Sequence, residues 1–203
     1  MTETNAYGPG NNGPDYLHKP TSAGRLVPVA KIEVRGPSQE VVPIGEIGEI
    51  WFFGPHLIRG YWNKPEATAE TIVDGWLRSG DLGRVDDEGF VHVVDRAKDM
   101  VLRAGENIYS SEVEAAIYEH PAIHEAAVFG VPHERLGEEV AAAVFCKPGQ
   151  SLTLESLREF LAGRIAPFKI PSRLLDTKEA LPRNPAGKFL KRDIRDLLIE
   201  ETS

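Results

Sequence analysis

Apolar residues from position 27 to about position 95 come in short runs that glycine, proline or aspartate separates. Runs of this length, closed by turn-forming residues, are typical of strands that fold back on one another. This part of the chain is therefore predicted to form an antiparallel sheet or a small barrel. The expected strands lie at 27–36, 46–54, 57–62, 75–85 and 89–95.

The chain begins with a segment that has no regular pattern. Residues 1–26 contain five glycines or prolines between Gly8 and Pro14, with Asn11 and Asn12 among them. Because such residues interrupt both helices and strands, this segment is predicted to be a loop.

Beyond Asp95, helical spacing alternates with short strands. Ser111 and Glu114 are spaced as in a capping box and predict the start of a helix that Pro121 ends. This alternation is typical of a small α+β domain. Further strands are expected at 122–132, 138–148 and 169–177, and further helices at 153–166 and 189–201, the last with Leu190, Ile194, Leu197 and Leu198 facing inward.

The predicted fold class is therefore α+β, in two parts. A small antiparallel β subdomain is expected over residues 1–95, followed by a compact α+β C-terminal domain over residues 96–203. The boundary between them is expected between Asp95 and Asp99, where the hydrophobic pattern changes.

Composition and charge exclude several classes of protein. The chain has 203 residues and a net charge of −8, which is unsuited to binding nucleic acid phosphates. No apolar run approaches the roughly 20 residues that cross a bilayer, and the N-terminus has no basic region followed by an apolar stretch. Cys146 is the single cysteine and cannot form an internal disulfide, so a cytoplasmic protein is expected.

Three segments carry candidate chemistry. Asp81, between two glycines, could accept hydrogen bonds from the hydroxyls of a ribose; alternatively, its side chain bonds its own backbone in a turn. Gly105 lies in the highly charged segment 95–114 and would let a ligand approach the backbone; alternatively, this segment is a solvated hairpin. Lys188 could reach a phosphate or carboxylate; alternatively, it belongs to a basic helix start that faces water.

Other candidates are weaker. The PRNPAGKF segment does not match the phosphate-cradling GxxxxGK[ST] loop, because Pro182 and Phe189 stand at two of its fixed positions. His120 and His124 are interpreted as surface histidines, since nothing supplies further metal ligands. Cys146 ends an apolar strand and is interpreted as a small core residue.

Six segments, taken in order, resemble one family along the whole chain. They are similar to the C-terminal part of the adenylate-forming enzymes, the group of acyl-CoA synthetases, luciferases and peptide-synthetase adenylation domains. The AGENI and PRNPAGK segments most resemble those of medium- and long-chain acyl-CoA ligases. The six segments are MTET, GEIGEIWFFG, GYWNKPEATAE, GWLRSGDLG, DRAKDM with AGENIYSSEVE, and PRNPAGK.

The resemblance implies an ATP-dependent ligase that works in two half-reactions. A carboxylic acid, here a fatty acid, would attack the α-phosphate of ATP to give an acyl-adenylate and pyrophosphate, with Mg²⁺ at the phosphates. The thiol of coenzyme A would then attack the acyl carbon and release AMP. Residues 96–203 would be a mobile domain that rotates between the two steps, so that one active site serves both. Residues 1–95 would be the β-rich end of the large AMP-binding domain.

The resemblance also implies residues that hold the nucleotide. Asp81 would bind the ribose hydroxyls, Arg96 would assist at the ribose or phosphate, and Val93 would line the adenine pocket. Thr2 would lie near the phosphates, and Glu3 near the magnesium ion.

Three more residues would serve the chemical steps. Lys188 would contact the carboxylate and the α-phosphate and would stabilise charge during adenylation. Lys98 occupies the position of the family's hinge. Gly105 would lie at the pantetheine tunnel during thioester formation, where a side chain would block access.

In this family the phosphate loop and the acyl pocket precede the position of Thr2. The chain is therefore expected to be a fragment that lacks an N-terminal domain and is inactive alone. Two other hypotheses stay open. One is an acyl-AMP ligase or an adenylation domain that loads a carrier protein. The other is a naturally short, non-catalytic module that binds a nucleotide or dimerises.

Overall fold

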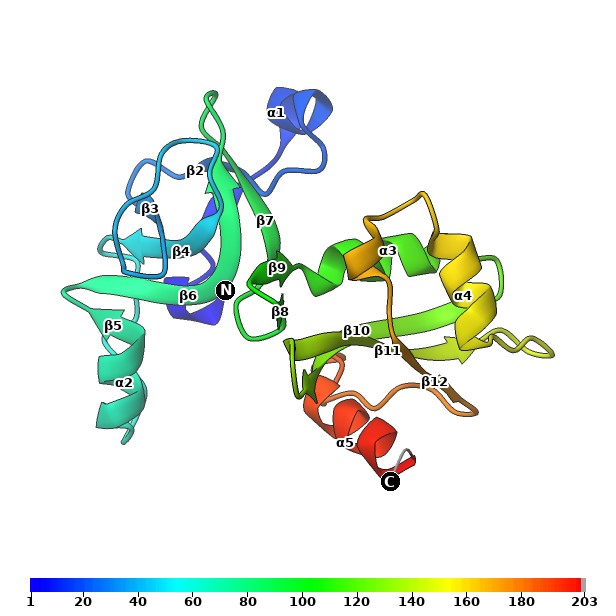
Figure 1. Cartoon of the computed structure of the whole chain (residues 1–203). Coiled ribbons are helices and arrows are strands. Elements are labelled where there is room, and N and C mark those ends of the chain that lie inside the picture. Colours follow the sequence, from blue (N-terminus) through cyan, green and yellow to red (C-terminus); the bar gives the residue numbers. More distant parts are fainter. Residues whose placement is uncertain (202–203) are drawn as a thin grey trace. The chain divides into compact units, whose positions relative to one another are not determined.

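The computed structural model describes residues 1–201, which form two compact units (Figure 1). The first unit runs from Met1 to Lys98, and the second begins at Asp99. Each unit has its own sheet and its own apolar core. No helix within residues 1–201 is long and apolar enough to cross a membrane.

A seven-stranded sheet, in which neighbouring strands run antiparallel, forms the first unit. The strand order is β1-β2-β7-β6-β4-β3, and β5 pairs with β6. Ile50, Phe52, Leu77 and Val91 come together in its core. The strands are β1 (Pro9–Gly10), β2 (Gly24–Leu26), β3 (Lys31–Arg35), β4 (Gly48–Phe53), β5 (Ile72–Val73), β6 (Trp76–Val85) and β7 (Phe90–Arg96); the helical segments are η1 (Thr2–Thr4), α1 (Gly13–His18) and α2 (Pro65–Thr71).

The prediction of a loop over residues 1–26 is wrong. Pro14 lies in the first turn of α1, where a proline is tolerated because the N–H that it lacks has no helical partner. Pro9 lies in β1, which ends the strand order and pairs only with β2 among residues 1–201. An edge strand can contain a proline because the backbone N–H groups on its outer side pair with no neighbouring strand.

The strand expected at 57–62 is also absent. The chain turns there, and the Tyr61 amide donates a hydrogen bond of 2.9 Å to the Thr68 hydroxyl on α2. The Thr68 hydroxyl on the following helix thus accepts the backbone hydrogen bond that the Tyr61 N–H would donate to a neighbouring strand in a sheet.

A five-stranded sheet with helices on both faces forms the second unit (Figure 1). Ala126 and Val128 on β10 face the core beneath α3 and α4, whereas Ala127 and Phe129 face the core beneath α5. The strand order is β10-β11-β8-β9, and β12 lies parallel to β11. The elements are β8 (Val101–Arg103), β9 (Glu106–Ile108), α3 (Ser110–Tyr118), β10 (Ile123–His133), β11 (Gly137–Cys146), α4 (Leu154–Leu161), η2 (Pro167–Lys169), β12 (Arg173–Thr177) and α5 (Lys191–Glu201).

The predicted α+β fold class is confirmed, with two corrections in the second unit. Helix α3 begins at Ser110, so Ser111 is not its N-cap, and Glu114 instead forms an ion pair with Lys191. Leu197 is 46 % exposed although it was expected to face inward. A helix that lies on a sheet buries one stripe, and Leu197 lies beside that stripe.

Cys146 is a core residue, as predicted. Its side chain belongs to the core beneath α3 and α4. Burial raises the pKa of the thiol to about 11, with a further contribution from Asp176. The thiol is therefore protonated at neutral pH and is not a nucleophile.

Candidate functional site

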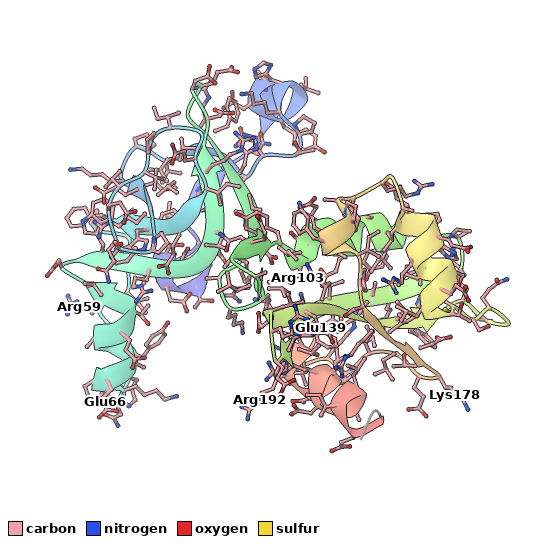
Figure 2. All side chains as sticks on the ribbon, viewed as in Figure 1. Arg59, Glu66, Arg103, Glu139, Lys178 and Arg192 are labelled. Atoms are coloured by element: carbon pink, nitrogen blue, oxygen red, sulfur yellow. The ribbon has the colours of Figure 1, made fainter. Side chains whose placement is uncertain are left out.

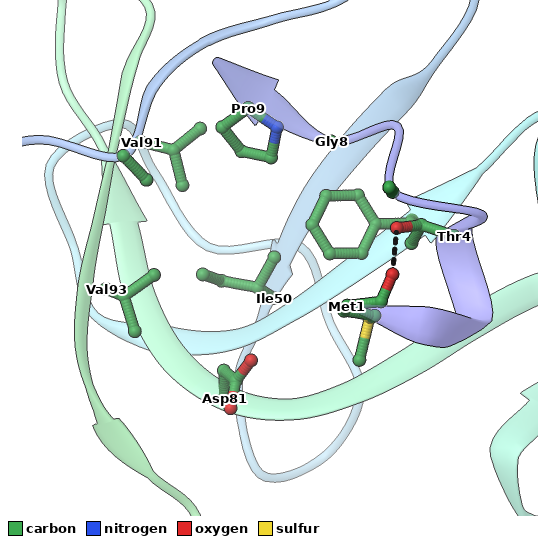
Figure 3. A pocket seen from close by; sticks show the side chains of 11 residues that line it. Met1, Thr4, Gly8, Pro9, Ile50, Asp81, Val91 and Val93 are labelled. Atoms are coloured by element: carbon green, nitrogen blue, oxygen red, sulfur yellow. Dashed lines mark hydrogen bonds between the residues drawn. The ribbon is translucent and has the colours of Figure 1, made fainter. Parts of the chain in front are cut away.

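A pocket in the first unit brings two of the expected nucleotide residues together (Figure 3). Its volume is about 180 Å³, and apolar side chains line it together with Thr4 and the carboxylate of Asp81. Val93 also lines the pocket and is 55 % exposed, so a ligand can reach it from solvent. The remaining lining residues are Met1, Ala6, Gly8, Pro9, Ala23, Ile50, Phe52 and Val91.

Asp81 lies where strand β6 is irregular. Gly80 has a φ of +70°, and the register with β7 shifts just after Asp81, between Leu82 and Gly83. The Asp81 amide donates a 3.0 Å hydrogen bond to the Ser79 hydroxyl. Ser79, and not the Asp81 carboxylate, therefore bonds the backbone of this turn. The carboxylate accepts no hydrogen bond from the backbone of this turn.

Arg96 lies opposite Asp81 on strand β7. Its Nε is 3.2 Å from Asp81 Oδ1, at ion-pair distance, although Nε forms no hydrogen bond within residues 1–201. The two side chains are 42 % and 32 % exposed, so solvent screens their attraction to about 1 kcal/mol at most. A carboxylate and a guanidinium beside an apolar wall can bind the hydroxyls or phosphate of a ligand whose ring contacts that wall.

Thr2 and Glu3 belong to the short helix η1. The Tyr61 hydroxyl donates a 3.1 Å hydrogen bond to Glu3 Oε1, and the Ile58 amide donates a 2.9 Å hydrogen bond to the Glu3 carbonyl. Burial, followed by this bond to Glu3, raises the pKa of Tyr61. Glu3 Oε2 has no hydrogen bond to another residue in 1–201. Thr2 is exposed.

One carboxylate fits the way in which proteins hold Mg²⁺ at a nucleotide. Magnesium commonly keeps several waters and takes one or two carboxylates together with the phosphates of its substrate. Glu3 offers one such oxygen, Oε2. Residues 1–201 contain no group of three or more histidine, cysteine or acidic side chains that could hold a metal without a phosphate.

Lys98 and Gly105 lie in turns. Lys98 is exposed, and its Nζ makes no hydrogen bond or ion pair within the described part of the chain. Gly105 and Ala104 form the turn between β8 and β9 with φ values of +88° and +51°. A Cβ at Gly105 would meet no atom within 4 Å, so the space beside this glycine is open.

Lys188 projects from a small hairpin ahead of α5. The Asn184 amide donates to the Lys188 carbonyl, and the Leu190 amide donates to the Pro182 carbonyl, both at 2.9 Å. The Asn184 side chain accepts 3.0 Å hydrogen bonds from the amides of Ala186 and Lys188. The Lys188 backbone is therefore held on both sides, while its exposed ammonium group has no partner within residues 1–201.

Asn184 and Arg183 shape this hairpin and were not among the predicted site residues. Asn-Pro-Ala-Gly is a recognisable turn sequence, with asparagine first, proline second and glycine last, so Asn184 could have been found from its neighbours. Arg183 carries no such signal, because its partner Glu125 lies far away in the sequence.

Two family models match the chain. The model of the AMP-binding enzyme matches residues 1–62, and the model of the AMP-binding enzyme C-terminal domain matches residues 112–188. The matched ranges include Thr2 and Glu3 in the first unit and Lys188 in the second.

Curated relatives include ligases of two kinds. The chain is 42 % identical over 175 residues to a fatty acid–[acyl-carrier-protein] ligase from Streptomyces coeruleorubidus, with 86 % of this chain and 34 % of that protein covered. It is 40 % identical over 182 residues to a long-chain-fatty-acid–CoA ligase from Mycobacterium tuberculosis, with 90 % and 36 % covered. The chain thus spans about a third of the length of these relatives.

A solved structure has the same fold. It is o-succinylbenzoate CoA synthetase from Bacillus subtilis in complex with the acyl-adenylate intermediate, with a TM-score of 0.88 and 33 % identity. The match covers 97 % of this chain and 40 % of that one. A further structure of that enzyme holds ATP and a magnesium ion. The chain therefore belongs to the AMP-binding family of adenylate-forming enzymes.

Proposed function

We propose that the chain is part of an ATP-dependent acyl-CoA ligase that converts a fatty acid to an acyl-adenylate and then to an acyl-CoA. In this proposal, residues 1–95 form the end of the AMP-binding domain, and residues 96–203 form the domain that alternates between the two half-reactions. The observation that carries the proposal is the pocket that joins the Asp81 carboxylate to an apolar wall, in a chain that matches both family models.

In the first unit, Asp81 accepts hydrogen bonds from the two ribose hydroxyls, and Val93 contacts the adenine ring. Arg96, 3.2 Å from Asp81, adds a positive charge at the ribose or the phosphate. Thr2 lies near the phosphates, and Glu3 offers Oε2 to Mg²⁺, which when bound screens the charge of the phosphates. The exposure of Val93 and the free Glu3 oxygen support these roles.

In the second unit, Lys188 binds the α-phosphate and the attacking carboxylate during adenylation. A lysine suits this role because its ammonium group is a compact charge on a long stem, and here it has no competing partner within residues 1–201. Negative charge develops around the α-phosphate as the carboxylate oxygen bonds to the α-phosphorus and the bond to the departing pyrophosphate breaks, so a cation there lowers the barrier. Lys98 acts as the hinge, between units that meet at Lys98 and Asp99.

Gly105 serves the thioester step. The open space beside it suits the passage of the pantetheine arm of coenzyme A, and a larger side chain would fill that space. The likeness to a fatty acid–[acyl-carrier-protein] ligase supports a second candidate acceptor, the thiol of a carrier protein, in place of coenzyme A.

The test uses the longer protein that contains this chain. Lys188→Ala is expected to lower acid-dependent ATP–pyrophosphate exchange by about 10²–10³-fold, because it removes one donor that stabilises the transition state. The rate of thioester formation from supplied acyl-adenylate should stay within about twofold of the rate in the original protein. Lys178→Ala, another exposed lysine of the second unit (Figure 2), is the matched control and should change neither rate.

Two results would contradict the proposal. One is the absence of exchange with every acid tested, including fatty and aryl acids, in a folded protein. The other is equal loss of both half-reactions in Lys188→Ala. Comparison of coenzyme A with a carrier protein as the acceptor decides between the two candidate acceptors.

A further inference from the structure

Arg183 connects two residues of the hairpin that carries Lys188 to a carboxylate outside it. Its Nη1 donates a 2.7 Å hydrogen bond to the Gly187 carbonyl, and its Nη2 lies 2.9 Å from Glu125 Oε1. Its guanidinium carbon is 3.9 Å from the centre of the Phe189 ring. The residues on both sides of Lys188 therefore contact one planar group.

Glu125, on strand β10, joins this guanidinium to the sheet. Its second oxygen accepts a 2.8 Å hydrogen bond from the amide of Leu181, which precedes the hairpin. The Glu125 side chain is only 13 % exposed. Burial raises its pKa, but the hydrogen bonds from Arg183 and Leu181 outweigh that effect, and the pKa lies below its usual value. Glu125 is thus charged at neutral pH and holds both partners.

A second link holds the other end of the hairpin, at the start of α5. Lys191 Nζ lies 2.7 Å from Glu114 Oε1 and donates a 2.9 Å hydrogen bond to the Ser110 hydroxyl. The same Glu114 oxygen accepts a 2.8 Å hydrogen bond from the amide of Val128 on β10. Both ends of the hairpin are therefore tied to the region of β10 and α3.

These contacts determine where the Lys188 side chain starts. The ammonium group has no partner within residues 1–201, so its reach depends on its backbone and not on neighbouring side chains. A displacement of about 1 Å in a reacting group can slow a reaction about 10²-fold. We propose that Arg183 and Glu125 are positioning residues that hold Lys188 for adenylation; this rests on the role given to Lys188 above.

The second unit offers a matched control arginine. Arg164 Nη1 lies 2.8 Å from Glu119, its Nε donates a 3.0 Å hydrogen bond to the Phe160 carbonyl, and its guanidinium carbon is 4.2 Å from the Phe160 ring. Arg164 thus makes the same three kinds of contact as Arg183. It does so beside α4 and away from the hairpin in the sequence.

The experiment measures both half-reactions in the longer protein, for Arg183→Ala, Glu125→Gln and the control Arg164→Ala. We expect Arg183→Ala and Glu125→Gln to lower kcat of ATP–pyrophosphate exchange about 10–100-fold. The rate of thioester formation from supplied acyl-adenylate should stay within about twofold, which shows that the variants are folded. Arg183→Lys keeps a charge for Glu125 but cannot also reach Gly187 with a planar fork. Its kcat of exchange should therefore lie between those of the original protein and Arg183→Ala.

A double variant separates positioning from general stabilisation. If Arg183 acts through Lys188, adding Arg183→Ala to Lys188→Ala should lower exchange no further, because residues that act as a unit are not additive. Arg164→Ala should leave exchange within about twofold in either background.

The positioning role is overturned if Arg183→Ala lowers exchange no more than Arg164→Ala does. It is also overturned if Arg183→Ala slows both half-reactions equally, or if its effect adds fully to that of Lys188→Ala. These results leave the function of Lys188 intact. By contrast, normal exchange in Lys188→Ala alone would overturn the role of Lys188 on which this proposal rests, and absence of exchange in the original protein would overturn the proposed function itself.

Discussion

At the scale of single residues, the Asp86 carboxylate in the first unit has four hydrogen-bond partners. Its Oδ2 lies 2.6 Å from Lys19 Nζ and 2.9 Å from His92 Nε2, and its Oδ1 accepts hydrogen bonds from the amides of Glu88 and Phe90. The bond from Lys19 does most to hold the pKa of Asp86 well below its usual value, against the effect of burial, and His92 and Phe90 add to it.

The sign of this pKa shift predicts how acid acts on the first unit. A carboxyl whose pKa is lowered by folding stabilises the folded state above its unfolded pKa, and that contribution is lost as the pH falls from about 4 downward. Asp86→Asn should therefore be less stable than the original protein at pH 7. It should also lose less of its stability between about pH 4 and pH 2.

Tryptophan fluorescence during urea unfolding at each pH measures this effect, since Trp51, Trp62 and Trp76 all lie in the first unit. Asp87→Asn is the matched control: Asp87 is the next residue, is exposed and makes no hydrogen bond or ion pair within residues 1–201. Parallel pH curves for the original protein and Asp86→Asn would contradict the prediction.

At the scale of elements, helix α5 shows how adjacent leucines differ in their surroundings. Ile194 and Leu198, four residues apart, are 0 % and 2 % exposed and enter the core that β10, β11 and β12 share with α5. Leu197 is 46 % exposed. The spacing of four residues places the two buried side chains on one stripe of the helix.

Leu198→Ala is expected to lower the free energy of unfolding by about 2–5 kcal/mol, because it removes buried methyl groups and leaves a cavity. The control Leu197→Ala should change the free energy of unfolding by about 0.5 kcal/mol or less, because its side chain is largely exposed and buries little apolar surface. Urea denaturation followed by circular dichroism measures both values. Equal losses in the two variants would show that α5 does not dock by this stripe.

At the scale of the whole molecule, the cores of the two units share no residues. The core of the first unit draws on strands β4, β6 and β7, whereas both cores of the second unit use only residues after Asp99. A unit of about 100 residues with its own core is within the usual size of a domain.

Residues 99–203 expressed alone should therefore fold cooperatively. The expected result is a dispersed amide NMR spectrum together with a single cooperative transition in urea. A collapsed spectrum, with no cooperative transition in urea, would show that this unit depends on residues 1–98.

Periodicity and turn residues were sufficient for the elements whose partners lie nearby in sequence. The segments at 122–132 and 138–148 form β10 and β11, because alternating small and β-branched side chains can fill a sheet that is covered on both faces. The prediction of a loop was wrong where turn-forming residues lie inside a helix or a strand. Pro14 fits the first turn of α1, and Pro9 fits an edge strand.

The sequence by itself determined the α+β class, the family resemblance and the position of Lys188 ahead of the last helix. Only the tertiary structure decided that Asp81 and Val93 share a pocket and that Arg183 reaches Glu125, which lies 58 residues earlier. Hydrophobic periodicity reports which face of an element is buried, but not which element covers it. A contact between distant residues depends on how the chain folds back, so no local pattern encodes it.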